Sequence, residues 1–248
     1  MKELVSIITP CYNSEKFIDE TIHSVLQQTF ENWEMLIVDD ASTDSSVQHI
    51  EEHLKKDSRI QCIQLSQNSG AAVCRNTAIQ HAKGRYLAFL DSDDLWKPHK
   101  LEKQIDFMKT NVYSFSFSGY QKMDEEGNLI DKGTVFANEK ISYTDMLTSN
   151  KIGCLTAIYD TKKLGKIYMP LIKKRQDYAL WLKVLKITPF AYGYQESLGY
   201  YRLRKSSMSS LKIEMLKWNW KMFREIEKMP FYKAAYSVFM NVVYKYFR

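Results

Sequence analysis

The sequence has no run of 18 or more consecutive apolar residues, so we expect no helix that crosses a membrane. A strand-like segment follows directly after Met1-Lys2-Glu3-Leu4, and we therefore expect no signal peptide. Internal repeats and low-complexity linkers are also missing. These absences favour a cytoplasmic protein whose 248 residues form one large domain, or one domain with an appendage.

Cysteine is scarce and scattered along the chain. The four cysteines show no Cys-x-x-Cys spacing, and reduced thiols explain them best; they are Cys11, Cys62, Cys74 and Cys154. Hydrophobic residues make up 45% of the chain and charged residues 26%, as in ordinary soluble globular proteins. The formal net charge of +6 is mildly basic, which favours an anionic partner without identifying one.

The most informative stretch is residues 86–94, where a short apolar segment ends in three carboxylates, Asp91, Asp93 and Asp94. The apolar part predicts a buried parallel strand, so the acids are expected at its carboxyl end, where open α/β sheets place their ligands. An Asp-x-Asp pair suits Mg²⁺ or Mn²⁺, which prefer oxygen ligands and share them with substrate phosphates. Taken alone, such acids more often form a solvated loop that caps the next helix.

Strand-like and helix-like segments alternate four times within the first 95 or so residues. Strands are expected at 5–9, 34–38, 59–65 and 86–90, and helices at about 14–28, after Asp44 to about 56, and at 71–81, with Ser14 as the cap of the first helix. This alternation predicts a Rossmann-like α/β architecture, a doubly wound and mostly parallel sheet with helices on both faces.

Beyond residue 94 the alternation becomes looser. We expect a helix at 98–109, a strand at 113–122, a hairpin turn at 125–128, a strand at 155–159, a helix at 177–185, and strands at 190–194 and 198–203 along a sheet edge. The second half therefore extends the first rather than forming an independent domain.

The last segment, residues 211–248, is basic, aromatic and helical in pattern. It holds eight basic residues against three acidic ones, and Pro230 is expected to split it into two helices. Ten aromatic side chains accompany the basic residues: Trp218, Trp220, Phe223, Phe231, Tyr232, Tyr236, Phe239, Tyr244, Tyr246 and Phe247. The composition suits a helix in the headgroup region of an anionic bilayer, and equally a helix packed on the preceding domain with a solvated basic face.

Polar residues follow three of the four early strands, and parallel topology brings them to one edge of the sheet. They are residues 9–13, 39–40 and 91–94. A nucleotide fits this set, since Tyr12 can stack on a base, Asp39 can accept a hydrogen bond from a uracil imide or a ribose hydroxyl, and Arg75 can contact a phosphate. Asp93 would hold the metal ion on the pyrophosphate. Singly, Tyr12 is more often a packed aromatic, Asp39 a helix cap and Arg75 a surface cation.

Four blocks stand in order along the chain: Val5-Ser6-Ile7-Ile8-Thr9-Pro10-Cys11-Tyr12-Asn13, Ile37-Val38-Asp39-Asp40-Ala41-Ser42-Thr43-Asp44, Asn68-Ser69-Gly70 with Arg75-Asn76, and Leu90-Asp91-Ser92-Asp93-Asp94 with Pro98. Together they resemble family 2 glycosyltransferases of the GT-A fold, in particular the bacterial enzymes of teichuronic acid, O-antigen and capsule synthesis. The resemblance is strong over residues 5 to about 100 and continues more loosely to about 207. It implies a glycosyltransferase domain at 1–210, with a nucleotide-binding half at 1–100 and an acceptor-binding half at 101–210, followed by the tail at 211–248.

The resemblance also implies a nucleotide-sugar donor, usually linked to UDP, and an inverting displacement at the anomeric carbon. By position, the nucleotide sugar would be bound by Thr9, Pro10, Tyr12, Asp39, Arg75, Asp91 and Ser92. Within that set Asp91 would contact the ribose or the sugar. Asp93 would hold the Mn²⁺ or Mg²⁺ ion.

An inverting transfer needs a carboxylate that takes the proton of the acceptor hydroxyl. The block Lys173-Lys174-Arg175-Gln176-Asp177-Tyr178-Ala179-Leu180-Trp181 resembles the family's acid-acid or Gln-Asp block, which implies that Asp177 is this base. Asp177 could also be the N-cap of its helix. Residues 201–209 resemble a late family segment that folds over the diphosphate. Some relatives have a metal-binding histidine near Arg204; here that stretch has none, so Arg202 or Arg204 is expected to share the phosphate role.

We therefore expect a metal-dependent inverting glycosyltransferase, cytoplasmic or peripheral on the inner face of the membrane, that extends a bacterial surface polysaccharide. Its partners would be a UDP-sugar, a glycan acceptor on a lipid diphosphate and an anionic membrane surface, with no nucleic acid. One alternative is a sugar-1-phosphate nucleotidyltransferase, but those enzymes usually have a Gly-rich loop where this chain has Pro10-Cys11-Tyr12-Asn13. The other is a non-catalytic nucleotide-sugar-binding partner protein, against which the presence of Asp91, Asp93 and Asp177 argues.

Overall fold

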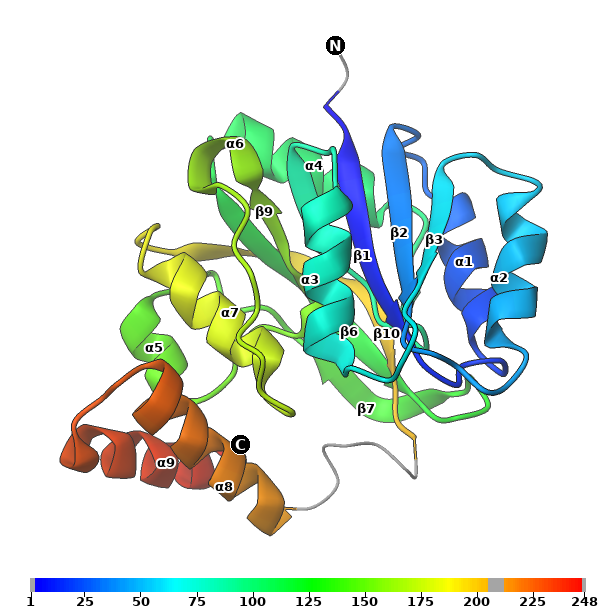
Figure 1. Cartoon of the computed structure of the whole chain (residues 1–248). Helices are drawn as coiled ribbons and strands as arrows, with labels where there is room; N and C mark the ends of the chain where they lie inside the picture. The colour runs from blue at the N-terminus through cyan, green and yellow to red at the C-terminus, as the bar shows by residue number, and fades with distance from the viewer. Residues whose placement is uncertain (1–2, 205–211, 247–248) are drawn as a thin grey trace.

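The computed structural model describes residues 3–204 and 212–246 (Figure 1). Within these ranges one sheet has the strand order β3-β2-β1-β4-β9-β6-β10-β5, with β7 paired to β6 and β8 paired to β10. The strands are β1 (Val5–Cys11), β2 (Trp33–Asp39), β3 (Ile60–Gln64), β4 (Tyr86–Phe89), β5 (Leu95–Trp96), β6 (Phe115–Met123), β7 (Leu129–Val135), β8 (Lys140–Ile141), β9 (Ile158–Asp160) and β10 (Ala191–Arg202). The helices are α1 (Ile18–Leu26), α2 (Ser46–Leu54), α3 (Ala71–His81), α4 (Lys100–Thr110), α5 (Tyr143–Thr148), α6 (Thr161–Leu164), α7 (Gln176–Leu185), α8 (Lys212–Lys221) and α9 (Phe231–Tyr246), with a 3₁₀ turn at Cys154–Thr156 and a π-helical turn at Met222–Ile226.

Strand β1 lies inside the parallel part of the sheet. It pairs in parallel with β2 on one side and β4 on the other, and β2 pairs in parallel with β3. Strand β9 enters antiparallel between β4 and β6, and beyond it β6 and β10 are again parallel. The expected doubly wound, mostly parallel sheet is confirmed, and it continues from the first half of the chain into the second.

Both faces of β1 are buried in hydrophobic clusters. Ile8 belongs to the cluster that includes α3 and α7, whereas Ile7 belongs to the cluster that includes α1 and α4. Because successive side chains of a strand point to opposite faces, a strand that is apolar at both positions needs helices on each side. This alternation explains why helices cover the two faces of the sheet, as expected.

The first helix begins at Ile18, so the expectation that Ser14 caps a helix from residue 14 is wrong. Residues 14–17 form a turn in which the backbone carbonyl of Ser14 accepts hydrogen bonds from Phe17 and Ile18. The hydroxyl of Ser14 instead lies 2.8 Å from the hydroxyl of Ser92. The serine therefore ties the end of β1 to the acidic loop that follows β4.

The two edge strands expected at 190–194 and 198–203 are one continuous strand, β10. Its register with β6 shifts between Tyr194 and Ser197 and again between Ser197 and Tyr200, so the polar pair Gln195-Glu196 marks an irregularity within the strand rather than its end. The strand is not at the edge, because β6 pairs with it on one side and β5 and β8 on the other. Strand β9 is also shorter than expected, since the 3₁₀ turn at Cys154–Thr156 precedes it.

The C-terminal helices pack beside α5 and α7 (Figure 1). Met222, Phe223 and Ala234 are fully buried, and the rings of Phe223 and Tyr178 meet edge to face with their centroids 6.0 Å apart. Another face of α9 carries four exposed aromatic side chains, which we call the aromatic stripe: Phe231, Tyr232, Tyr236 and Phe239, each 62–68% exposed. The tail is thus packed on the domain and still presents aromatic surface, while the expected aromatic side chains Tyr246 and Phe247 lie outside the described side chains. Across the described residues, no helix combines the length and the apolar character needed to span a bilayer.

Candidate active site

The carboxyl ends of β1, β2 and β4 lie together at one edge of the sheet. Strands β1 and β2 stay in register from Val5 opposite Trp33 to Cys11 opposite Asp39, and β4 accompanies β1 up to Phe89 opposite Ile8. The loops that leave these three strands therefore begin side by side, as parallel topology requires.

Asp91, the first acid after β4, is held by Arg75 of α3. The guanidinium Nη2 of Arg75 lies 2.5 Å from Oδ1 of Asp91, and its Nη1 donates to Oε1 of Gln176 at 3.3 Å. Arg75 is almost completely buried, whereas Asp91 is partly exposed. The arginine therefore connects the acidic loop after β4 to the first turn of α7, and it faces Asp91 rather than standing free at the surface.

Asp93 and Asp94 complete the acidic loop in a poorly solvated place. Burial, with the neighbouring charge of Asp91 adding to it, raises the pKa of Asp93. Burial and the charge of Asp93 raise the pKa of Asp94 well above its usual range, although its Oδ1 accepts a hydrogen bond from the backbone N–H of Arg202 at 2.9 Å. The loop thus concentrates negative charge where water stabilises it poorly, so a cation bound there would lower its free energy.

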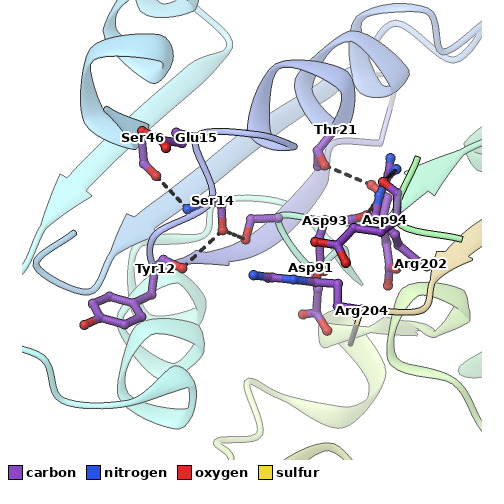
Figure 2. Close-up of polar contacts among 12 residues, drawn as sticks. Tyr12, Ser14, Glu15, Thr21, Ser46, Asp91, Asp93, Asp94, Arg202 and Arg204 are labelled. Carbon is purple, nitrogen blue, oxygen red and sulfur yellow. Dashed lines mark hydrogen bonds and ion pairs between the residues drawn. The ribbon is translucent and has the colours of Figure 1, made fainter. Parts of the chain in front are cut away.

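Two arginines at and after the end of β10 face this acidic loop (Figure 2). Arg204 pairs with Oδ2 of Asp93 at 3.2 Å, and its Nε is buried without a partner among the described residues. Arg202 is buried and donates to the carbonyls of Asp93 and Glu125 and to the carboxylate of Glu20. Arg202 is therefore engaged by protein groups on all sides, and Arg204 is the better placed of the two to meet a phosphate.

The residues expected to bind the nucleoside differ in solvent exposure. Tyr12 is 47% exposed, and its ring points away from the acidic loop in Figure 2. Thr9 and Pro10 are buried within β1, and the hydroxyl of Thr9 finds no hydrogen-bond partner in the described part of the chain. Asp39 is also buried and accepts hydrogen bonds from the backbone N–H and the hydroxyl of Ser42 at 2.9 and 2.5 Å. Tyr12 is thus the member of this group that is directly accessible to a ligand.

Asp40, for which no individual role was expected from the sequence, fixes the start of α3. Its two carboxylate oxygens accept hydrogen bonds from the backbone N–H groups of Ser69 and Gly70, at 2.7 and 2.8 Å. Gly70 has φ +92°, a left-handed conformation that side-chain-bearing residues rarely adopt, and α3 begins directly after it. Asp40 thereby fixes the loop that starts the helix carrying Arg75.

Two cavities lie at this edge of the sheet and share Gln176 as a lining residue. The acid-lined cavity, of about 400 Å³, is bordered by Arg75, Asp91, Asp94, Lys151, Arg175 and Asp177 among others. The Tyr12 cavity, of about 570 Å³, is bordered by Tyr12, Asp40, Ser69, Leu171 and Lys173 among others. Each is large enough to take part of a nucleotide sugar, and the shared residue Gln176 makes them neighbours.

Asp177 reaches the acid-lined cavity because α7 is anchored on β4. The ring of Trp181 packs edge to face on Phe89, with centroids 5.3 Å apart, and both residues are fully buried. This contact places the first turn of α7 beyond the end of β4. Arg175 is the N-cap residue of α7, so the alternative role of Asp177 as N-cap is wrong.

Asn150 orients the Asp177 carboxylate. Its Nδ2 donates a hydrogen bond to Oδ2 of Asp177 at 3.1 Å, from a loop that lies between α5 and the 3₁₀ turn. No individual role was expected for Asn150 or Gln176 from the sequence. The position of Gln176 directly before Asp177 could have indicated a role for Gln176. The sequence has no such signal for Asn150, which is 27 residues away from Asp177.

Comparisons with known proteins agree with this geometry. Residues 6–169 match the family model described as glycosyl transferase family 2. TuaG of Bacillus subtilis (strain 168), a glycosyltransferase assigned to teichuronic acid biosynthesis, is 48% identical over 235 residues, which are 95% of this chain and 93% of TuaG. WfgD of Escherichia coli, named UDP-Glc:alpha-D-GlcNAc-diphosphoundecaprenol beta-1,3-glucosyltransferase, is 40% identical over 236 residues, which are 94% of this chain and 90% of WfgD.

Two solved structures share the fold. TarS 1-349 of S. aureus in complex with UDP-GlcNAc superposes with a TM-score of 0.72 at 24% identity, covering 96% of this chain and 70% of that one. The mannosyltransferase PcManGT of Pyrobaculum calidifontis, in complex with GDP-Man and Mn²⁺, gives a TM-score of 0.70 at 16% identity, covering 91% of this chain and 64% of that one. These likenesses confirm the expected GT-A fold.

Proposed function

This chain belongs to glycosyltransferase family 2, and from that membership and its similarity to WfgD we propose that it moves a sugar from a UDP-sugar to a glycan acceptor carried on a lipid diphosphate. The reaction would serve bacterial surface polysaccharide synthesis; TuaG is assigned to teichuronic acid biosynthesis, and WfgD is named for an acceptor on diphosphoundecaprenol. The observation that carries the proposal is the acid-lined cavity, which brings Asp91 and Arg75 together with Asp177. The proposed donor-binding acid and the proposed proton acceptor thus border the same cavity.

We assign the donor to the two adjoining cavities. The base would stack on Tyr12, whose ring is accessible, while the buried Asp39, Thr9 and Pro10 would shape the floor beneath the nucleoside. The ribose or the sugar would contact Asp91 and Arg75, and Ser92 would hold the loop through Ser14. Arg204 would meet the diphosphate, because it lies beside Asp93 with a buried Nε that finds no partner among residues 3–204 and 212–246.

Asp177 is assigned as the general base of an inverting transfer. It would accept the proton of the acceptor hydroxyl as that oxygen attacks the anomeric carbon on the face opposite the departing UDP. Asn150 would hold the carboxylate in orientation, since its amide donates to Oδ2 of Asp177. The second oxygen of Asp177 would then be directed at the acceptor.

A divalent ion fits the acidic loop. Within the described residues, no three His, Cys, Asp or Glu side chains are grouped so as to hold a metal ion by themselves. Asp93 offers one hard oxygen ligand whose pKa is raised by burial, and Mg²⁺ or Mn²⁺ usually takes only one or two carboxylates together with substrate phosphates. When bound there, the ion would neutralise charge that develops on the leaving diphosphate.

A transfer assay tests the proposed function. Purified protein with Mn²⁺ should move radiolabelled sugar from one member of a UDP-glucose, UDP-GlcNAc, UDP-galactose and UDP-glucuronate panel to GlcNAc-diphosphate carrying an alkyl chain. A sugar-1-phosphate nucleotidyltransferase would instead form UDP-sugar from UTP and a sugar phosphate, and a non-catalytic partner would bind the donor without turnover. Either of those results would exclude the proposed reaction.

The tail gives this glycosyltransferase a proposed contact with the membrane that carries such an acceptor. The aromatic stripe, whose members are Phe231, Tyr232, Tyr236 and Phe239, is bordered by the exposed Lys228 and Lys233. Aromatic rings beside lysines suit the headgroup region of an anionic bilayer, where rings bury their apolar faces and cations meet lipid phosphates. We therefore propose peripheral association through α9.

Replacing both Tyr236 and Phe239 with serine should lower binding to vesicles of phosphatidylglycerol and phosphatidylcholine by about tenfold or more, because two exposed rings lose their place in the bilayer interface. Vesicle co-sedimentation measures the change. Truncation of the whole tail is a poorer test, since it would expose the core around Phe223. Unchanged binding of the double variant, relative to a control with Lys56→Gln beyond α2, would refute the proposed contact.

A further inference from the structure

One wall of the acid-lined cavity is basic. Lys151 comes from the loop after α5, and Lys174 and Arg175 come from the segment before α7; all three border the cavity that also contains Asp177. We call these three residues the cationic wall. The donor roles assigned above use Arg75 and Arg204 and leave the cationic wall without a function.

Arg175 is held in an uncommon backbone conformation with a buried side-chain nitrogen. Its φ is +68°, in the left-handed region that residues other than glycine seldom adopt, and such strain often marks a ligand site. Its Nε is buried without a hydrogen-bond partner anywhere in residues 3–204 and 212–246, and burial lowers the pKa of Arg175. A buried guanidinium N–H that lacks a hydrogen-bond acceptor is stabilised when an anion binds beside it.

The cationic wall is also where the tail meets the cavity. Lys174 pairs with Glu214 of α8 at 2.7 Å, and Met215 of α8 lines the cavity itself. The ammonium of Lys151 lies 5.1 Å from the ring centroid of Tyr244 in α9. A ligand bound at this wall would therefore lie next to α8 and to α9, the helix that carries the aromatic stripe.

We propose that the cationic wall binds the diphosphate of a lipid-linked acceptor, with the lipid leaving the cavity beside α8 and α9. This inference rests on the proposed function and specifies which residues recognise its acceptor. Arg175 and Lys174 precede Asp177 by two and three residues. In an acceptor whose hydroxyl contacts Asp177, the diphosphate is attached to the same sugar ring, and it would therefore lie close to these cations. The donor diphosphate is assigned to Arg204 and to the metal ion at Asp93. A second diphosphate needs other cations to bind it.

Two acceptors that differ only in the diphosphate test the proposal. One is GlcNAc-diphosphate with an alkyl chain, and the other is the GlcNAc glycoside of the same alkyl chain. In Arg175→Gln and Lys151→Gln, KM for the diphosphate acceptor should rise by about tenfold to a hundredfold, while KM for the neutral glycoside and for the UDP-sugar stays constant. Lys56→Gln, which changes a basic residue far from the cavity, should leave all three values unchanged, and Arg175→Lys should recover part of the affinity.

Each other outcome has a distinct meaning. A rise of KM for the UDP-sugar alone would assign the cationic wall to the donor, and equal changes for both acceptors would show that it does not recognise the diphosphate. Calorimetric titration with the diphosphate acceptor needs no turnover. Binding to the wild type that is lost in Arg175→Gln would support diphosphate recognition by the cationic wall, even if no sugar were transferred from a UDP-sugar. Loss of the native melting transition in Arg175→Gln would leave Lys151→Gln to decide.

Discussion

Replacing Asp177 with asparagine should lower the rate of sugar transfer by about 10²–10⁴-fold, the usual contribution of a general base. Asparagine has nearly the same shape and can still accept the hydrogen bond from Nδ2 of Asn150, but its amide does not take a proton from the acceptor hydroxyl. The first turn of α7 would lose one favourable negative charge, which costs only about 0.3–1 kcal/mol of stability. The initial rate of transfer under saturating donor measures the effect.

Donor binding separates a chemical role of Asp177 from a structural one. The dissociation constant of UDP should stay within about twofold in Asp177→Asn, since the nucleoside is assigned to the Tyr12 cavity and Asp177 borders the other one. The exposed Asp106 on α4 offers a matched carboxylate, and Asp106→Asn should retain full activity. Wild-type turnover in Asp177→Asn would exclude Asp177 as the base.

Replacing Asp93 with asparagine should lower metal-stimulated transfer by about a hundredfold or more, because the neutral amide is a far weaker ligand for Mn²⁺ than a carboxylate. Chelation of the metal by EDTA should reduce the transfer rate of the wild type by a similar factor, and it should have little further effect on the rate of Asp93→Asn. Initial rates across a Mn²⁺ titration measure both results.

The same variant also tests the ion pair between Asp93 and Arg204. Asparagine removes the charge that Arg204 pairs with at 3.2 Å and also one of the like charges that raise the pKa of Asp94. We therefore expect the melting temperature without ligands to hold or rise, whereas the rise caused by UDP with Mn²⁺ should shrink relative to the wild type. An undiminished UDP and Mn²⁺ shift would show that the ion binds elsewhere.

The strand and helix pattern of the first hundred residues was predictable because it is local. The continuous burial of β1 and the helix signal over residues 71–81, which matches α3 residue for residue, depend on near neighbours in sequence. Predictions that needed distant contacts were less accurate. Ser14 was expected to cap a helix, but its hydroxyl contacts Ser92, 78 residues away. The polar pair Gln195-Glu196 predicted the end of a strand, but β10 continues through it because β5, β6 and β8 pair with β10.

The candidate site divides in the same way. Asp91, Asp93, Tyr12 and Asp177 stand in short segments that resemble family blocks, so their positions were visible before any fold was known. The placement of Asn150, Asp40 and Arg175 was not visible, because each depends on a partner or a conformation that only folding supplies. These are the carboxylate of Asp177 for Asn150, the N–H groups of Ser69 and Gly70 for Asp40, and a left-handed backbone beside a cavity for Arg175.

The amino-acid sequence by itself determined a doubly wound α/β domain with acids at the carboxyl ends of its strands, since apolar strand segments and the polar residues that follow them lie within a few positions of one another. Only the tertiary structure decided that the cationic wall and Asp177 border the same cavity and that the tail contacts this wall. Those contacts join Lys174 to Glu214 and Lys151 to Tyr244, and they follow from the packing of Trp181 on Phe89 and of Phe223 on Tyr178.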